Sequence, residues 1–341
     1  MPQRPAPDDL YWKCENGNRF VENRVAAVFR GNRERAVVIS WSEIRRKHLP
    51  DHADAILPPQ ISLPMLPEAV VNFCHRADDP SVTIAELARI VETDIGLSLE
   101  LMRYANSCAV GLRHKVQSPQ QAITALGIRS AKLILVTSAV QRAMSLRHSK
   151  LLPVRNFWYG NLERALIAKN IAWSLSVCEE LAYAAGLLQD YLLPLLTNEL
   201  YETYLQFTDV SKGPQHTLVE FERERFGWDH AQAGAHVMLD WCFPDDLICC
   251  VLFHHRGLSI LDDAVLGRSE AAAAAVAGLM PDLLRQEPEG LARLIELEGR
   301  WPEFRLERLA HEVEQEFRKM APAGRDYITF RHRCEKVLQA L

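Results

Sequence analysis

Hydrophobic residues recur at helical spacing along most of the chain from Leu57 onward, and turn or capping residues separate the segments that carry them. Thr83, followed three positions later by Glu86, has the form of a capping box. In this motif the threonine side chain accepts from the third helical N–H and the glutamate reaches back. The apolar residues at 84, 87, 90 and 91 then fall on one face. We therefore expect a helix to begin at this point.

A second helix start is predicted at Ser118, because proline follows it at the first helical position. Gly127 is expected to end that helix as a left-handed cap. Another helix follows, with apolar residues at 133, 136, 140 and 144 facing inward. Further helices are predicted at about 157–177, 180–190, 229–242, 245–255, 262–284 and 306–320.

The first 56 residues show a different pattern. Two β-type runs, at 25–29 and 36–39, flank a turn that contains Gly31 and Asn32. This arrangement is typical of a β-hairpin. The fold class is therefore expected to be mainly α, with a small β element at the N-terminus.

The chain is expected to divide into four parts. Residues 1–56 form an N-terminal extension with the hairpin, and 57–150 form a first helical half. Residues 151–285 form a second helical half, and 286–341 form a C-terminal helical extension. The boundary between the halves is placed at 151–155, where Pro153 interrupts an apolar run.

The composition narrows the classes of function. The 341 residues are 48% hydrophobic and carry a net charge of −5, which excludes a mostly disordered chain and argues against nucleic-acid binding. No apolar run approaches the roughly 18 residues of a membrane helix, and the N-terminus lacks the apolar segment of a signal peptide. The eight cysteines show no zinc-site spacing, so free thiols and a cytoplasmic location are expected.

Several separated motifs occur in an order that resembles the HDOD domain of bacterial signalling proteins. The resemblance covers about residues 57–285. Its motifs are LPMLP at 63–67, IVETD at 90–94, LMRYANS at 101–107, QAITALG at 121–127, GLLQD at 186–190 and FGWDH at 226–230, followed by Gly234, Trp241, Pro244, His254 and His255.

The resemblance implies a multi-helical bundle in two halves, related to the HD superfamily of metal-dependent phosphohydrolases. HDOD proteins are regarded as non-catalytic regulators or scaffolds in signal transduction. The segments outside about 57–285 lie beyond the resemblance, and it implies nothing about them.

The metal ligands of the HD superfamily are incomplete in this sequence. The resemblance predicts a histidine near Gly160, and none is present; it also predicts a His-Asp pair where the chain has Gln189 and Asp190. A glutamine amide is a poor ligand for a hydrolytic metal. We therefore expect no catalytic residues, no cofactor and no enzymatic activity.

The matching positions that remain are Asp190, His230, His254 and His255, which we call the histidine cluster. One interpretation is a remnant metal or anion site, for which these four are weak candidate ligands. The favoured interpretation is that they pair with one another and with the backbone inside the bundle, so no metal is expected.

A groove between the two helical halves is a further candidate site, with Asn106, Ser107 and Gln189 on it. The more ordinary role for Asn106 and Ser107 is local, because such side chains satisfy backbone groups at helix ends.

The sequence thus favours a non-catalytic, cytoplasmic regulatory protein that binds a signalling protein or a nucleotide. One alternative is a divalent-metal phosphohydrolase acting on a nucleotide or cyclic nucleotide. Another is a purely structural interaction domain, in which the histidine cluster is only part of the core.

Overall fold

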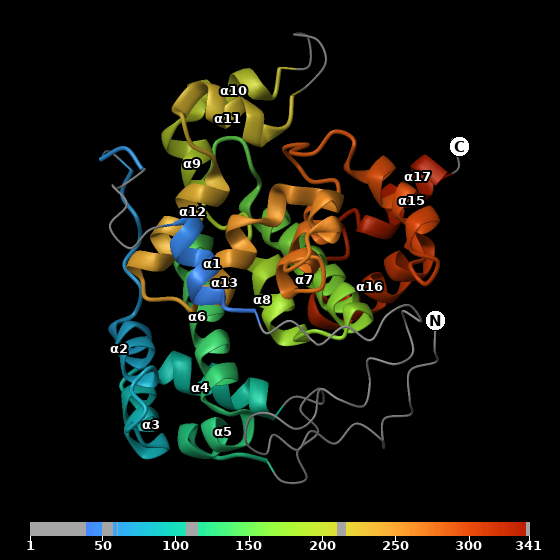
Figure 1. Ribbon diagram of the computed structural model, residues 1–341. Coiled ribbons are helices and arrows are strands. Elements are labelled where there is room, and N and C mark those ends of the chain that lie inside the picture. The colour runs from blue at the N-terminus through green and yellow to red at the C-terminus, as the bar shows by residue number, and fades with distance from the viewer. Residues whose placement is uncertain (1–38, 50–56, 60, 107–114, 210–215, 339–341) are drawn as a thin grey trace.

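The structure is a computed structural model that describes residues 39–49, 57–59, 61–106, 115–209 and 216–338. Within these ranges every regular element is a helix, which confirms the mainly α class. Figure 1 shows the helices in chain order. The hairpin prediction falls on residues 25–39, which lie outside the described part except for Ile39, so it stays a prediction.

The first half is a bundle of five helices that pack on one another in pairs. Thr83 forms the predicted capping box with Glu86, and Ser118 caps its helix with Pro119 in the first turn. Gly127 has the predicted positive φ of 80°, but its ψ of 158° is extended rather than left-handed helical, because the next helix starts there. The helices are α2 (Glu68–Ala77), α3 (Ile84–Glu92), α4 (Ile95–Ala105), α5 (Pro119–Leu126) and α6 (Ile128–Ser145).

The second half is built around a long central helix, α7, which packs most closely on α8 and also on α14. Its elements are α7 (Val154–Leu175), α8 (Glu179–Leu188), α9 (Leu193–Glu199), α10 (Tyr201–Phe207), α11 (Leu218–Phe226), α12 (His230–Asp240), α13 (Asp245–Leu252), the 3-10 segment η3 (His254–Asp262) and α14 (Glu270–Gly278).

The predicted helix at 262–284 is wrong for most of its length, since only α14 within it is helical. Asp263 accepts hydrogen bonds from the backbone N–H groups of Val265 and Leu266 and so stabilises a turn. Ser269 then caps α14. The apolar pattern of this alanine-rich segment predicts one long helix, because turns made by single side chains do not change that pattern.

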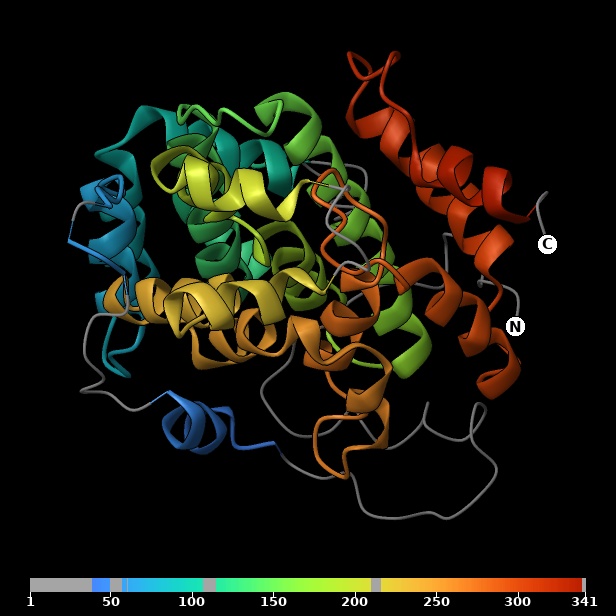
Figure 2. The same cartoon turned by 90° about the horizontal axis from the view of Figure 1, so that it is seen from above.

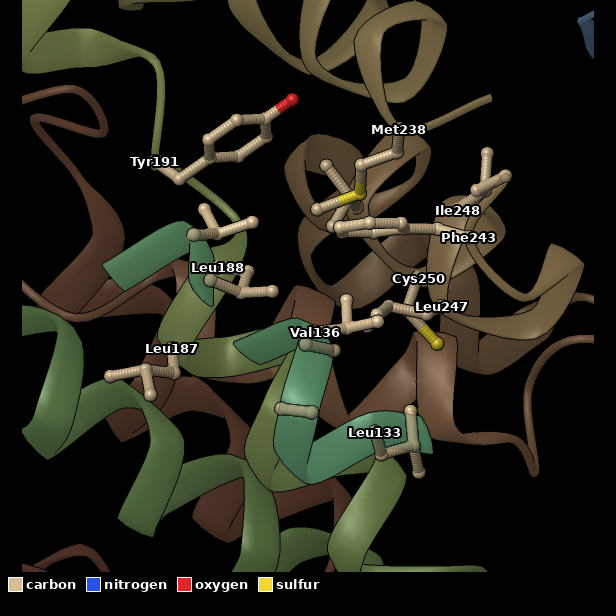
Figure 3. Packing of buried hydrophobic residues seen from close by; sticks show 14 of the residues in the cluster. Leu133, Val136, Leu187, Leu188, Tyr191, Met238, Phe243, Leu247, Ile248 and Cys250 are labelled. Carbon is tan, nitrogen blue, oxygen red and sulfur yellow. The ribbon is translucent and has the colours of Figure 1, made fainter. Parts of the chain in front are cut away.

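The two halves share one hydrophobic core that continues across the predicted boundary and includes Leu152. Figure 3 shows part of this core, with Leu133 and Val136 of α6, Leu188 of α8 and Leu247 of α13 among its labelled side chains. The two halves therefore pack as one unit.

The C-terminal segment packs on α7 through a second apolar cluster. Figure 2 shows it at one side of the molecule, away from the first half. Its helices are α15 (Gly290–Arg300), α16 (Leu306–Met320) and α17 (Phe330–Leu338). The buried Glu163 of α7 anchors this segment, because it accepts from the backbone N–H of Phe330 at 2.6 Å and from Arg333 at 2.8 Å.

Helix α1 (Trp41–His48) lies against α13. The buried Arg45 donates to Asp245 at the start of α13 at 2.8 Å, and the ring of His48 meets Phe253 edge-on. This helix lies in the predicted N-terminal extension, for which the sequence analysis names only a hairpin.

No single helix in the described ranges is both long and apolar enough to cross a membrane. The pair α5 and α6 meets these criteria only when taken together, and it is bent by 117°.

Gly186 lets α7 and α8 approach closely. A Cβ at this position would lie 2.8 Å from the carbonyl oxygen of Arg164 and 2.9 Å from the Cα of Ala165. We expect Gly186→Ala to lower the free energy of unfolding by about 2 kcal/mol, because two backbones would have to separate. Gly299→Ala is the matched control: nothing lies within 4 Å of its Cβ, so a gain of roughly 0.5–1 kcal/mol is expected. Urea unfolding of both variants measures the difference, and equal effects would contradict the close approach.

Candidate functional site

The histidine cluster assembles where three helices begin or end. Asp190 follows α8, His230 is the first residue of α12, and His254 and His255 follow α13. The cap of α12 fixes the position of His230, because Asp229 and Gln232 form a capping box at its start. One ligand atom from each of the four cluster residues lies within 4.8 Å of the others. The structure thus brings together all four residues singled out in the sequence.

Each histidine of the cluster is held at its Nδ1 atom by an oxygen acceptor. His230 Nδ1 lies 2.7 Å from the Glu222 carboxylate, His254 Nδ1 lies 2.6 Å from the carbonyl oxygen of Val251, and His255 Nδ1 lies 3.3 Å from Glu287. Such contacts orient the rings and place a proton on Nδ1. The three Nε2 atoms are therefore the ones that face the interior of the cluster.

The Nε2 atoms meet beside one oxygen of Asp190. The Oδ1 atom of Asp190 lies 3.3 Å from Nε2 of His230 and 3.2 Å from Nε2 of His254, and the Nε2 atoms of His230 and His255 are 2.9 Å apart. Asp190 Oδ1 and His254 Nε2 are both buried and make no aligned hydrogen bond. Within the described structure, these are the buried side-chain atoms of the four cluster residues that have no hydrogen-bond partner.

Arg164 of α7 supplies a positive charge to this buried network. Its NH1 group donates to Oδ2 of Asp190, and its NH2 group donates to Asp282 at 3.0 Å. Gln286 adds an N–H to the same Asp190 oxygen at 2.9 Å. Arg164 and Asp190 are 2% and 1% exposed, so water does not screen their attraction.

The charged groups around the histidine cluster determine the protonation states of its side chains. Burial alone would raise the pKa of Asp190, but Arg164 and the histidines hold it well below its ordinary value. Burial alone would lower the pKa of His230, but Glu222 and Asp190 outweigh it and raise that pKa to about 10. Burial and the neighbouring His254 and His230 lower the pKa of His255 well below its ordinary value. At neutral pH, His230 is thus an imidazolium that donates to a neutral His255.

The raised pKa of His230 predicts a loss of stability at alkaline pH. Its contribution is complete below the unfolded pKa of about 6.5 and disappears as the pH rises through about 10. We expect the free energy of unfolding of the wild type, relative to His230→Gln, to fall by about 4 kcal/mol between pH 6 and pH 10. Urea unfolding of both proteins across this range measures the difference, which also cancels the titration of the cysteines. A difference that is constant with pH would contradict the charged state of His230.

The donor set fits a single divalent ion of the kind that binds imidazole and carboxylate. Two observations support this fit. Asp190 Oδ1 and His254 Nε2 are buried and have no hydrogen-bond partner, and all three histidines are held at Nδ1. His230 and His255 would complete the set. Arg164 acts against such an ion, because it already neutralises Asp190.

Asn106, Ser107 and Gln189, which were predicted to lie on a groove between the two halves, are not part of the histidine cluster. Asn106 brackets the backbone of Val116, donating to its carbonyl oxygen at 3.0 Å and accepting from its N–H at 2.8 Å, in agreement with a local role. Ser107 lies outside the described residues. Gln189 is 2% exposed at the end of α8, and its Oε1 atom makes no hydrogen bond. The groove itself stays a prediction.

Sequence reasoning missed Arg164, Glu222 and Gln286, which hold the cluster in place. Glu222 lies eight residues before His230, and its second oxygen accepts from Tyr204 at 2.7 Å. Arg164 falls within the predicted helix at 157–177. A charged residue on a helix that is otherwise apolar on most sides is a signal that could have identified it.

Comparisons with known proteins place this geometry in context. The sequence model of the HDOD domain matches residues 63–257. An uncharacterized protein of Treponema pallidum (strain Nichols) is 21% identical over 198 residues, which are 57% of this chain and 38% of that protein. The chain therefore spans well under half the length of this curated relative.

Two solved structures from Shewanella amazonensis SB2B have similar folds. One, provisionally named a phosphohydrolase, is 21% identical with a TM-score of 0.53, over 85% of this chain and 95% of that one. The other, provisionally named a metal-dependent phosphohydrolase, is 21% identical with a TM-score of 0.51, over 71% and 84% of the two chains. At this level of identity the likeness concerns the fold alone.

Proposed function

Because this chain belongs to the HDOD domain family, we propose that it is a non-catalytic regulatory protein in signal transduction. It would act by binding a protein or nucleotide partner in the cytoplasm. The free thiols of the described cysteines agree with a reducing compartment.

The observation that carries the proposal is the ion pair between Arg164 and Asp190. A hydrolytic metal needs a carboxylate that is free to bind it and an open position for water and substrate. In this chain Arg164 and Gln286 occupy one oxygen of Asp190, and Gln189 stands where the resemblance predicts a histidine. His230 and His254 are each 1% exposed, so the cluster offers a substrate little access. These features favour a structural role for the cluster and a binding role for the protein.

Turnover of phosphate esters tests this proposal. Purified protein is incubated with a generic phosphodiester, a phosphomonoester and a nucleotide panel, each with Mn²⁺, Mg²⁺ or Zn²⁺. We expect rates equal to those of the isosteric variant Asp190→Asn and of buffer alone. Turnover that Asp190→Asn abolishes while the circular dichroism spectrum is unchanged would overturn the non-catalytic assignment.

The second candidate is a divalent-metal phosphohydrolase, and the convergence of the four ligand atoms within 4.8 Å favours it. The provisional names of the two proteins of similar fold agree with it. A bound ion there would supply Lewis-acid activation of water. Elemental analysis after mild dialysis tests whether the histidine cluster binds a metal, which the phosphohydrolase requires. One equivalent of Fe, Mn or Zn that is lost in both Asp190→Asn and His254→Gln would establish a metal site, and the turnover assay would then decide whether it is catalytic.

A further inference from the structure

A cavity of about 20 Å³ lies between α7, the segment at 280–286 and the C-terminal segment. Its lining includes Asn161 and Arg164 of α7, Gln286, and Tyr327 and Arg333 of the C-terminal segment. It adjoins the histidine cluster through Arg164 and Gln286, but it is formed by other elements. By its size it holds one or two groups the size of a water molecule.

Four polar atoms of the lining residues make no hydrogen bond. Three carry N–H groups, namely Nδ2 of Asn161, Nε of Arg164 and Nε of Arg333, and the fourth is the acceptor Oε1 of Gln286. Asn161, Arg164 and Gln286 are at most 2% exposed. Leaving such groups unpaired in the interior costs about 1–3 kcal/mol each, so a polar occupant is favoured.

The orientations of the two amide side chains are fixed by their other contacts. Asn161 accepts from Arg164 at 3.4 Å through Oδ1, which leaves its NH₂ group without a partner. Gln286 donates to Asp190 through Nε2, which leaves Oε1 unpaired. The occupant must therefore offer acceptors to several N–H groups and one donor to Gln286.

The charges already present favour a neutral occupant. Arg164 is paired with Asp190 and Asp282, and Arg333 is paired with Glu163 at 2.8 Å. Three carboxylates thus face two guanidinium groups, so a carboxylate or phosphate ligand would add repulsion. A carboxylate would also present an oxygen, rather than a donor, to Gln286.

We infer that this cavity binds the amide or lactam end of a small neutral ligand, whose C=O accepts from Asn161 and an arginine Nε and whose N–H donates to Gln286. The carbonyl oxygen and the N–H nitrogen of such a group match the one or two water-sized positions of the cavity, and the rest of the ligand would extend out of it. The site does not depend on the proposed regulatory function, since its binding test and the turnover assay report on different groups.

Ligand-observed NMR with acetamide tests the inference, with acetate and inorganic phosphate as competing probes. We expect saturable binding of acetamide, with acetate and phosphate at least tenfold weaker. Asn161→Asp keeps the shape but removes the donor, and it should weaken acetamide at least tenfold. Asn170→Asp, on the same helix but lining a different depression, is the matched control and should leave the affinity unchanged.

Three results would overturn the inference. The first is no acetamide signal with folded wild-type protein at 100 mM, which would mean that water alone fills the cavity. The second is tighter binding of acetate or phosphate, which would assign the cavity to an anion. The third is equal affinity in wild type and Asn161→Asp, which would place the bound acetamide elsewhere. If Asn161→Asp unfolds, Gln286→Met, which removes the acceptor Oε1, provides a second comparison and should also weaken acetamide at least tenfold.

Discussion

Replacing Asp190 by alanine is expected to lower the free energy of unfolding by about 3–5 kcal/mol. Among the described residues, the change leaves Asp282 as the ionic partner of the buried Arg164, and it removes the acceptor for Gln286. It also takes away a carboxylate that contributes to the raised pKa of His230. An unpaired buried charge costs more than the original pair contributed, so the loss is large. Urea unfolding after dialysis against a chelator measures it without a contribution from bound metal.

The control for Asp190→Ala is Asp240→Ala, at the exposed end of α12, which should change the unfolding free energy by no more than about 0.5 kcal/mol. A second variant tests the cause. Adding Arg164→Met and Asp282→Asn to Asp190→Ala removes both charges that would otherwise be left unpaired and should recover part of the lost stability. If this triple variant is less stable than Asp190→Ala alone, unpaired charge is not the source of the loss.

Glu163→Ala is expected to destabilise the protein by about 3 kcal/mol and to release the C-terminal segment. Glu163 is fully buried and accepts from the backbone N–H of Phe330, the hydroxyl of Tyr327 and the guanidinium of Arg333. Without it these donors lose their shared acceptor. Hydrogen exchange of residues 324–338 by mass spectrometry measures the release, and we expect exchange there to be at least tenfold faster than in the wild type, with a smaller change in α8.

Glu312→Ala is the matched control for Glu163→Ala, because Glu312 pairs with Arg308 on the exposed face of α16. Exposed pairs of this kind contribute little, so its exchange pattern should match the wild type. Equal exchange of the C-terminal segment in wild type and Glu163→Ala would show that the apolar contacts of α16 hold the segment without the glutamate.

The sequence predicted most of the fold because its helix signals are local. The capping box at Thr83 and Glu86 and the start at Ser118 were found where the structure has them. The helix predicted at 306–320 matches α16. The helix predicted at 262–284 failed because turns made by single side chains, such as Asp263, interrupt an apolar run without altering its composition.

The sequence predicted the four residues of the histidine cluster but not the side chains that hold Asp190 in place. Asp190, His230, His254 and His255 could be identified from the resemblance, and they converge. Arg164 and Gln286 could not, because they come from elements 26 and 96 residues away from Asp190 in the chain, and only packing brings them to it. For the same reason the sequence does not reveal the cavity at Asn161, whose walls come from four separate parts of the chain.

The central claim, that the protein acts by binding and not by catalysis, is tested most directly by phosphodiester turnover with added Mn²⁺ in wild type and Asp190→Asn. The account predicts that both give the rate of buffer alone. Metal-dependent turnover in the wild type, absent in a folded Asp190→Asn variant, would contradict it and make the histidine cluster an active site.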